Sequence, residues 1–294
     1  MTARVPRSIP PMASLLCTVV VLIGCQDRPA TQMPEMPSGA PPAPEALANG
    51  KVLSTPDDHS LTADEYLKLG MPAADRAWSG EEMSRAAKAL AALAKDDAGK
   101  LPRYRSDRSG VLFARMTSLQ NLEVYHNKKL SLDLRMTPAL AYFDATNNVL
   151  QVYVSSFLNG VTGDSELMEL IGSDLRTAAV LLGLVDEELP TIKQDDPNAA
   201  GRIAGLEKMR NGLATMTAGA LTTLTEASSY RTSERTRLLR YLQETLPAIV
   251  THISPAAQSE TKVRIETLAN DPNLKPLQPG LTELAAAVRK AVKQ

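Results

Sequence analysis

The chain has few of the residues that form cross-links or metal sites. Its 294 residues include only two cysteines and three histidines. Cys17 lies in an apolar leader and Cys25 ends it, so the remaining chain has no thiol for a disulfide or a cysteine metal site. The histidines, at positions 59, 126 and 252, are far apart in sequence. We therefore predict each to be an ordinary surface or core residue, and no metal cofactor.

Other absences restrict the function further. After the leader there is no apolar run of 18 residues and no glycine-rich phosphate loop. The leader holds two arginines and no acid, so the rest of the chain carries 30 basic against 33 acidic residues. No stripe of lysine and arginine with interleaved aromatics occurs. These features argue against nucleic acid as a partner.

The first 25 residues are typical of a lipoprotein leader. Arg4 and Arg7 precede an apolar run from Met12 to Gly24 that is too short to span a bilayer. The run ends in Leu22-Ile23-Gly24-Cys25, which resembles the lipobox of bacterial lipoproteins. We predict a signal peptide over 1–24 and lipidation of Cys25, with a signal sequence and a chance cysteine as the alternative. Gln26, in place of aspartate, favours the outer membrane, with the protein facing the periplasm.

Two further segments follow Cys25. Residues 25–60 are rich in proline and alanine, with too little apolar content to pack, and predict an extended tether. Residues 61–294 are long enough for a single domain with a sizeable core.

Helical signals dominate this domain. Thr62 with Glu65, and Ser79 with Glu82, have the spacing of capping boxes, which begin helices. A central helix is expected where apolar residues occupy most faces, at 165–184. Further helical patterns cover 200–227, 232–251, 258–270 and 281–292.

A small β-sheet is expected between the helices. Leu130, Leu132 and Leu134 alternate with polar residues, and the apolar runs 140–143 and 149–154 flank Asn147-Asn148, a plausible hairpin turn. Residues 110–122 suit a helix, while 122–125 could begin a strand. The order predicts a mostly helical α+β domain with a small sheet or hairpin packed on the central helix.

Three motifs follow one another from Pro138 onward: a stretch at 138–143, an apolar run rich in Val and Tyr at 149–154, and Glu166-Leu167 at the start of a helix that contains Gly172. This order resembles that of the HtpX-like and CAAX-prenyl-protease zinc metallopeptidases. In that family a Pro-Asn-Ala-Phe-like stretch, a strand rich in Val and Tyr, and a helix beginning Glu-Leu occur in sequence, and Gly172 falls before the motif position. Ser229-Tyr230-Arg231 before Glu234, and Thr251-His252 before Pro255, continue the similarity. The resemblance covers roughly 80–270 and implies a zincin-like fold.

The same comparison implies that catalysis is lost. The family helix carries His-Glu-x-x-His, which binds zinc and supplies a general base. This chain has Ser173, Asp174 and Thr177 at those positions, and only Glu234 remains of the ligand set. Hydroxyls are poor zinc ligands, so the resemblance implies a pseudoenzyme without zinc. Glu169, Ser173 and Thr177 share a helical face, which predicts a polar cleft lining together with His252, or a solvated stripe.

Three functional interpretations follow. The first is an envelope lipoprotein with an inactive peptidase-like domain that binds or regulates peptides or proteins in the periplasm. The second is a helix-rich structural or interaction lipoprotein unrelated to peptidases. The third is a hydrolase with an unorthodox site, which would require Asp174, Glu234 and His252 to lie within about 5 Å of one another. The acidic residues at 186–188 and 195–196 are expected to form a solvated loop, since they lack the ligand spacing of a calcium site.

Overall fold

The computed structural model describes residues 58–158, 164–193, 195–227 and 229–292, and within them every regular element is a helix. The expected sheet is therefore wrong for this part of the chain, while the mostly helical character is confirmed. Cys25, the leader and most of the tether lie outside the described residues. Within the described part, no helix is long and apolar enough to cross a bilayer.

Both capping boxes begin helices as expected. Thr62 caps α2 (Ala63–Lys68) and Ser79 caps α3 (Gly80–Asp97), and in each the third helical residue, Glu65 or Glu82, accepts a bond from the cap backbone. Gly70 ends the first segment with φ of +84°, a conformation that favours glycine. These local signals determined the helix starts because they satisfy backbone amides that the helix itself leaves free.

Helix α5 (Asp133–Leu158) replaces all three expected strands except the first residues of 130–134. Its buried residues follow a helical spacing: Ala139, Tyr142, Phe143, Val149, Leu150 and Tyr153. The expected hairpin turn is also helical, because Asn147 is buried and its Nδ2 donates to the Phe143 carbonyl one turn earlier, at 3.0 Å. An apolar run of this kind fits a strand or a buried helix equally well by pattern alone.

Segment 110–126 is helical as well. It forms α4 (Gly110–Met116) and the 3₁₀ turns η2 (Leu119–Asn121) and η3 (Glu123–His126), so the strand alternative at 122–125 is wrong. The other helices are α6 (Asp164–Glu188), α7 (Ala199–Thr223), α8 (Thr232–His252), α9 (Pro255–Ala269) and α10 (Gln278–Val292). Shorter turns are η1 (Ala98–Lys100), η4 (Leu189–Thr191) and η5 (Pro272–Leu277).

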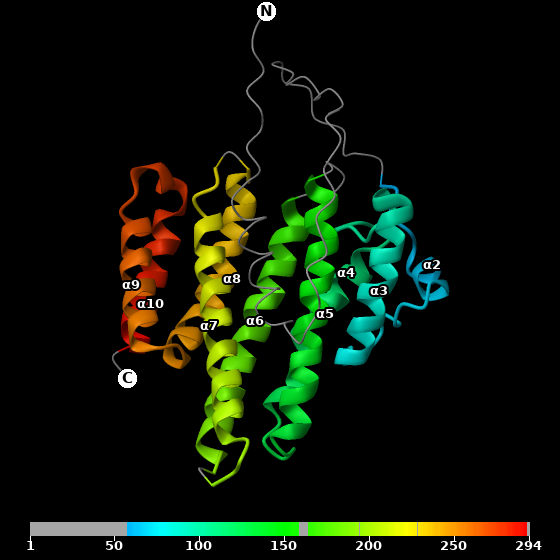
Figure 1. Ribbon diagram of the computed structural model, residues 1–294. Helices are drawn as coiled ribbons and strands as arrows, with labels where there is room; N and C mark the ends of the chain where they lie inside the picture. The colour runs from blue at the N-terminus through cyan, green and yellow to red at the C-terminus, as the bar shows by residue number, and fades with distance from the viewer. Residues whose placement is uncertain (1–57, 159–163, 194, 228, 293–294) are drawn as a thin grey trace, which may run out of the picture.

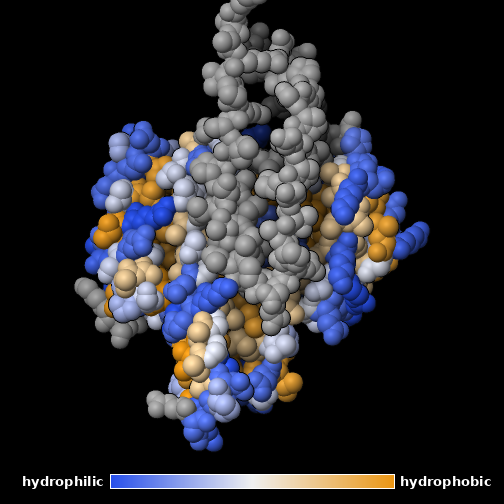
Figure 2. All heavy atoms as spheres, in the orientation of Figure 1, coloured by the Kyte–Doolittle hydropathy of each residue, from blue (hydrophilic) through white to orange (hydrophobic). Residues whose placement is uncertain are grey.

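The long helices form a row rather than a closed bundle. Figure 1 shows α3, α5, α6 and α8 side by side, with α9 and α10 at the far end. The main packing follows this order: α3 on α5, α5 on α6, α6 on α8, α8 on α10 and α10 on α9, while α7 packs on α6 and α8. In Figure 2 hydrophilic side chains dominate the two edges of the row, where α3 and α9 lie.

Helix α6 occupies the centre of the row, as its apolar pattern predicts. Leu175, Ala178, Leu181 and Leu182 are fully buried. Gly172 lets α8 approach closely, since a Cβ at this position would lie 2.5 Å from Tyr241 Cγ. Helix α6 is thus packed against α5 on one side and α8 on the other. The part of its surface between these two helices is partly open, and it contains the candidate site.

Candidate functional site

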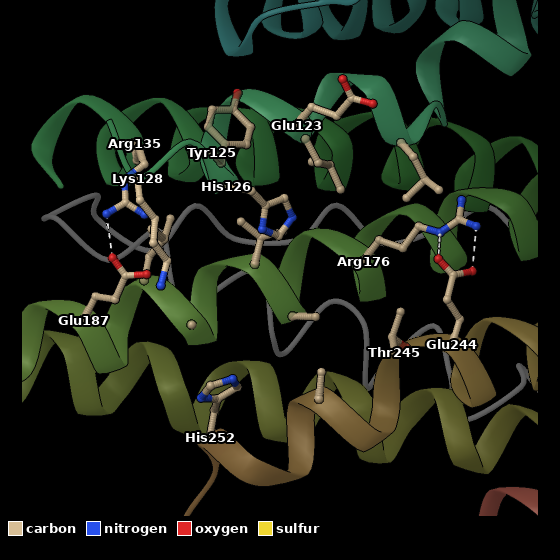
Figure 3. A pocket seen from close by; sticks show the side chains of 17 residues that line it. Glu123, Tyr125, His126, Lys128, Arg135, Arg176, Glu187, Glu244, Thr245 and His252 are labelled. Atoms are coloured by element: carbon tan, nitrogen blue, oxygen red, sulfur yellow. Dashed lines mark hydrogen bonds and ion pairs between the residues drawn. The ribbon is translucent and has the colours of Figure 1, made fainter. Parts of the chain in front are cut away.

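A groove runs along the partly exposed side of α6. It is a pocket of about 500 Å³ with one wall formed by η2, η3 and the start of α5 and the other by the second half of α8. Figure 3 shows this arrangement, with α6 between the two walls. Three segments that are distant in the sequence therefore contribute to one hollow, which we call the α6 groove.

The floor of the α6 groove consists of small and apolar residues. Ala179, Val180 and Gly183 of α6 contribute to it, and Ala248 lies on the α8 side. A Cβ on Gly183 would have no atom within 4 Å, apart from its own helix and chain neighbours. At Gly172 in the same helix the lack of a side chain is needed for α8 to pack closely, whereas at Gly183 no neighbouring helix requires it. A helical glycine costs about 0.5–1 kcal/mol relative to alanine, and packing within the described chain does not explain this cost.

One end of the groove is closed by an ion pair between Arg176 and Glu244. Arg176 of α6 donates from Nε and Nη2 to the two carboxylate oxygens of Glu244 on α8, at 2.8 and 2.7 Å. Its guanidinium also lies 4.7 Å from the ring centre of Tyr241. Burial lowers the pKa of Arg176, but the bond to Glu244 raises it, and the net shift is upward. This bidentate and stacked geometry holds α6 and α8 together.

The other end carries more positive charge. Arg135 of α5 donates to Glu187 of α6 at 2.5 Å, and this bond lowers the pKa of the Glu187 carboxyl. Lys128 also lies near Glu187 and lowers that pKa further, but it makes no ion pair within 4 Å with any described residue. Figure 3 shows Lys128 beside the Arg135–Glu187 pair.

Two of the three histidines lie on opposite walls of the groove. His126 extends from the η3 wall and His252 from α8 (Figure 3). His252 Nδ1 lies 2.6 Å from Asp186 Oδ2, and Arg210 of α7 donates to the other oxygen of Asp186 at 2.5 Å. The prediction of isolated histidines therefore misses a shared site, because residues 126 and 252 meet only through the helix packing. His252 thus lines the α6 groove, apart from the three residues that were expected to share a cleft with it.

Those other residues are buried between helices. Ser173 and Thr177 are 4% and 0% exposed, and the Thr177 hydroxyl donates to the Ser173 carbonyl at 2.9 Å. Glu169 is buried against α8, where it accepts a bond from the Tyr241 hydroxyl and lies 3.3 Å from Arg237 Nε. The burial of all three side chains makes their shared face a packing surface between helices and not a solvated stripe.

Asp174 is an acidic residue buried in the interior of the described part of the chain. It is 1% exposed, and neither carboxyl oxygen has a hydrogen-bond partner. The nearby Thr146 hydroxyl is engaged, since it donates to the Phe143 carbonyl at 2.9 Å. Burial raises the pKa of Asp174 to about 7, and Thr146 opposes this rise only in part.

The arrangement required by an unorthodox hydrolase does not occur. Glu234 and His252 lie in the first and last turns of α8, so 18 residues and about 27 Å of helix separate them. Asp174 is buried in the core and belongs to a different helix, α6. Glu234 is itself buried and accepts a bond from Ser233 Oγ at 2.9 Å. In the part of the chain that is described, no three His, Cys, Asp or Glu side chains gather closely enough to hold a metal ion.

Comparison with known proteins adds no assignment. No family model, curated protein or solved structure gives a significant match to this chain. The α6 groove is therefore the candidate site on its geometry alone.

Proposed function

We propose that this chain is a non-catalytic binding protein of the bacterial cell envelope, anchored through a lipid on Cys25, that holds a polypeptide segment in the α6 groove. The observation that carries the proposal is Gly183. Its missing side chain leaves α6 backbone accessible at the floor of a pocket of about 500 Å³. A site where a helix surface stays bare between two walls suits a peptide that packs closely on it.

The dimensions of the groove support a peptide of modest length. The charged pairs at its ends involve Arg176 and Glu187 of α6, 11 residues apart, which corresponds to about 16 Å along the helix. Roughly five residues of extended chain or three turns of helix cover this distance. The mixture of an apolar floor with polar ends is typical of ligand sites, in which few polar groups fix orientation.

The non-catalytic part of the proposal is supported by the positions of Ser173, Asp174 and Thr177. All three are buried away from the groove, so they offer no group to a ligand bound there. The metallopeptidase-like origin is a prediction from sequence order, from which the expected strand at 149–154 is now missing because these residues belong to helix α5. In this view a former peptidase kept a peptide site while its motif helix became part of the core.

A second candidate is a structural lipoprotein with no peptide ligand. The observation that favours it is the packing of α6, which contacts α5, α7 and α8 and buries most of its faces. The two candidates differ in one respect, since only a binding protein requires the α6 groove to be open.

The test is to fill the groove. A library of displayed random 12-residue peptides is selected on the full chain in detergent, and the enriched peptides are measured against Gly183→Trp. We expect binding to fall at least tenfold in this variant, because a side chain that starts from the unobstructed Cβ position of residue 183 fills part of the groove. Gly201→Trp is the matched control, since Gly201 of α7 is equally free of neighbours but lies outside the groove. Equal binding by wild type and Gly183→Trp would favour the structural candidate.

A further inference from the structure

The two ends of the α6 groove differ in charge. At one end the groove is lined by two cations, Lys128 and Arg135, and by one acid, Glu187. At the other end Arg176 pairs with Glu244, and Glu123 also lines the groove without an ion pair to any described residue. With neutral histidines, one end therefore has an excess of one positive charge and the other an excess of one negative charge.

At the positive end Glu187 and the adjacent Asp186 already have partners. Glu187 accepts from Arg135, and the two oxygens of Asp186 are engaged by Arg210 and His252. The exposed ammonium of Lys128 and the imidazole of His126 are left to interact with a ligand. Both side chains come from the same wall (Figure 3). A cation beside an imidazole N–H forms a site for an anionic oxygen group, whereas the Nδ1 of His252 is already bonded to Asp186.

We infer that the α6 groove selects a polypeptide segment carrying an acidic side chain at the end formed by Lys128 and His126. This inference rests on the proposed function and adds the chemistry and the orientation of the ligand. A side-chain carboxylate suits the site better than a chain terminus. Terminal carboxylates are generally captured by nests of backbone amides, whereas this end presents two side chains, from η3 and from the turn that follows it.

The test uses the peptides selected on the wild-type full chain, each synthesised with glutamate, glutamine or lysine at its acidic position. Glutamate→glutamine is expected to weaken binding severalfold at low salt, and Lys128→Glu by about tenfold, because a rim ion pair is replaced by repulsion. The lysine peptide is expected to bind Lys128→Glu better than it binds wild type. Lys129→Glu is the matched control, since this exposed neighbour does not line the groove.

Three results would overturn the inference, and they are distinguishable. Equal binding of the glutamate, glutamine and lysine peptides, with Gly183→Trp still abolishing it, would remove the charge selectivity and leave the groove as a peptide site. Loss of binding on C-terminal amidation, with no effect of glutamate→glutamine, would show that the terminal carboxylate is recognised instead. Binding that survives Gly183→Trp would remove both the inference and the proposed function.

Discussion

Replacing Asp174 with asparagine should change how the stability of the protein depends on pH. In the folded chain the carboxyl is buried without a hydrogen-bond partner and its pKa is raised to about 7 from 3.8. The unfolded chain releases this proton near pH 4 and the folded chain only near pH 7. Between these values the native state binds more protons, so the free energy of unfolding falls as pH rises and levels off above pH 7.

The magnitude follows from the two pKa values. A difference of about three pH units corresponds to about 4 kcal/mol, of which about 2–3 kcal/mol is lost between pH 5 and pH 8. Asparagine does not titrate, so the stability of Asp174→Asn should fall by about 2–3 kcal/mol less than that of wild type over the same interval. Other titrating groups affect both proteins equally and cancel in the comparison.

The assay is urea unfolding of the full chain at pH 5 and pH 8, followed by far-ultraviolet circular dichroism and by the fluorescence of Trp78, the one tryptophan of the chain. Asp107→Asn serves as the control, because Asp107 is exposed. The same pH dependence in wild type and Asp174→Asn would refute the reasoning. It would mean that Asp174 reaches water or a partner in the folded state.

Three other predictions concern packing and metal content. Gly172→Ala should destabilise the fold by about 1–3 kcal/mol, because the added methyl group overlaps Tyr241. Gly183→Ala in the same helix should stabilise the fold by about 0.5–1 kcal/mol. Urea unfolding measures whether stability falls or rises in each variant, and equal effects would contradict the close contact at Gly172. Asn121→Ala should cost about 2–3 kcal/mol and shift the fluorescence of Trp78 to the red. The reason is that Asn121 Oδ1 accepts from the Trp78 amide and Asn121 Nδ2 donates to the Tyr142 hydroxyl, both at 2.9 Å. An unchanged spectrum would argue against these two hydrogen bonds. Zinc-loaded and desalted protein should retain far less than one metal per chain by mass spectrometry, and stoichiometric zinc that is lost on Glu234→Ala or His252→Ala would reveal a rebuilt metal site.

Local signals in the sequence predicted most of the helices. The capping boxes before α2 and α3 and the apolar stripes of α8 and α10 depend on neighbours within one or two turns, which the sequence contains. Helix α5 was misread because Tyr142, Phe143, Val149 and Tyr153 are bulky residues that favour strands when partners are available. Its burial between α3 and α6 is a tertiary property, and no local pattern encodes it.

The candidate site was largely beyond reach from the sequence. Its walls come from residues 119–135 and 244–252 and its floor from 176–187, so the order of the helices in space had to be known first. The polar face of Ser173 and Thr177 drew attention to the side of α6 that is buried. One signal that the sequence analysis did not use is Gly183, a glycine inside a helical pattern with no turn to explain it.

The row of helices has a mechanical consequence for the α6 groove. One wall belongs to the half of the molecule that contains α3 and α5, and the other to the half that contains α8, α9 and α10. Arrays in which each helix mainly contacts its neighbours can bend by small adjustments at successive interfaces. Bending about α6 would widen or narrow the groove, so a ligand that grips both walls would also set the curvature of the whole domain. Occupancy of the groove would then be detectable at the far ends of the row, as a change in their separation.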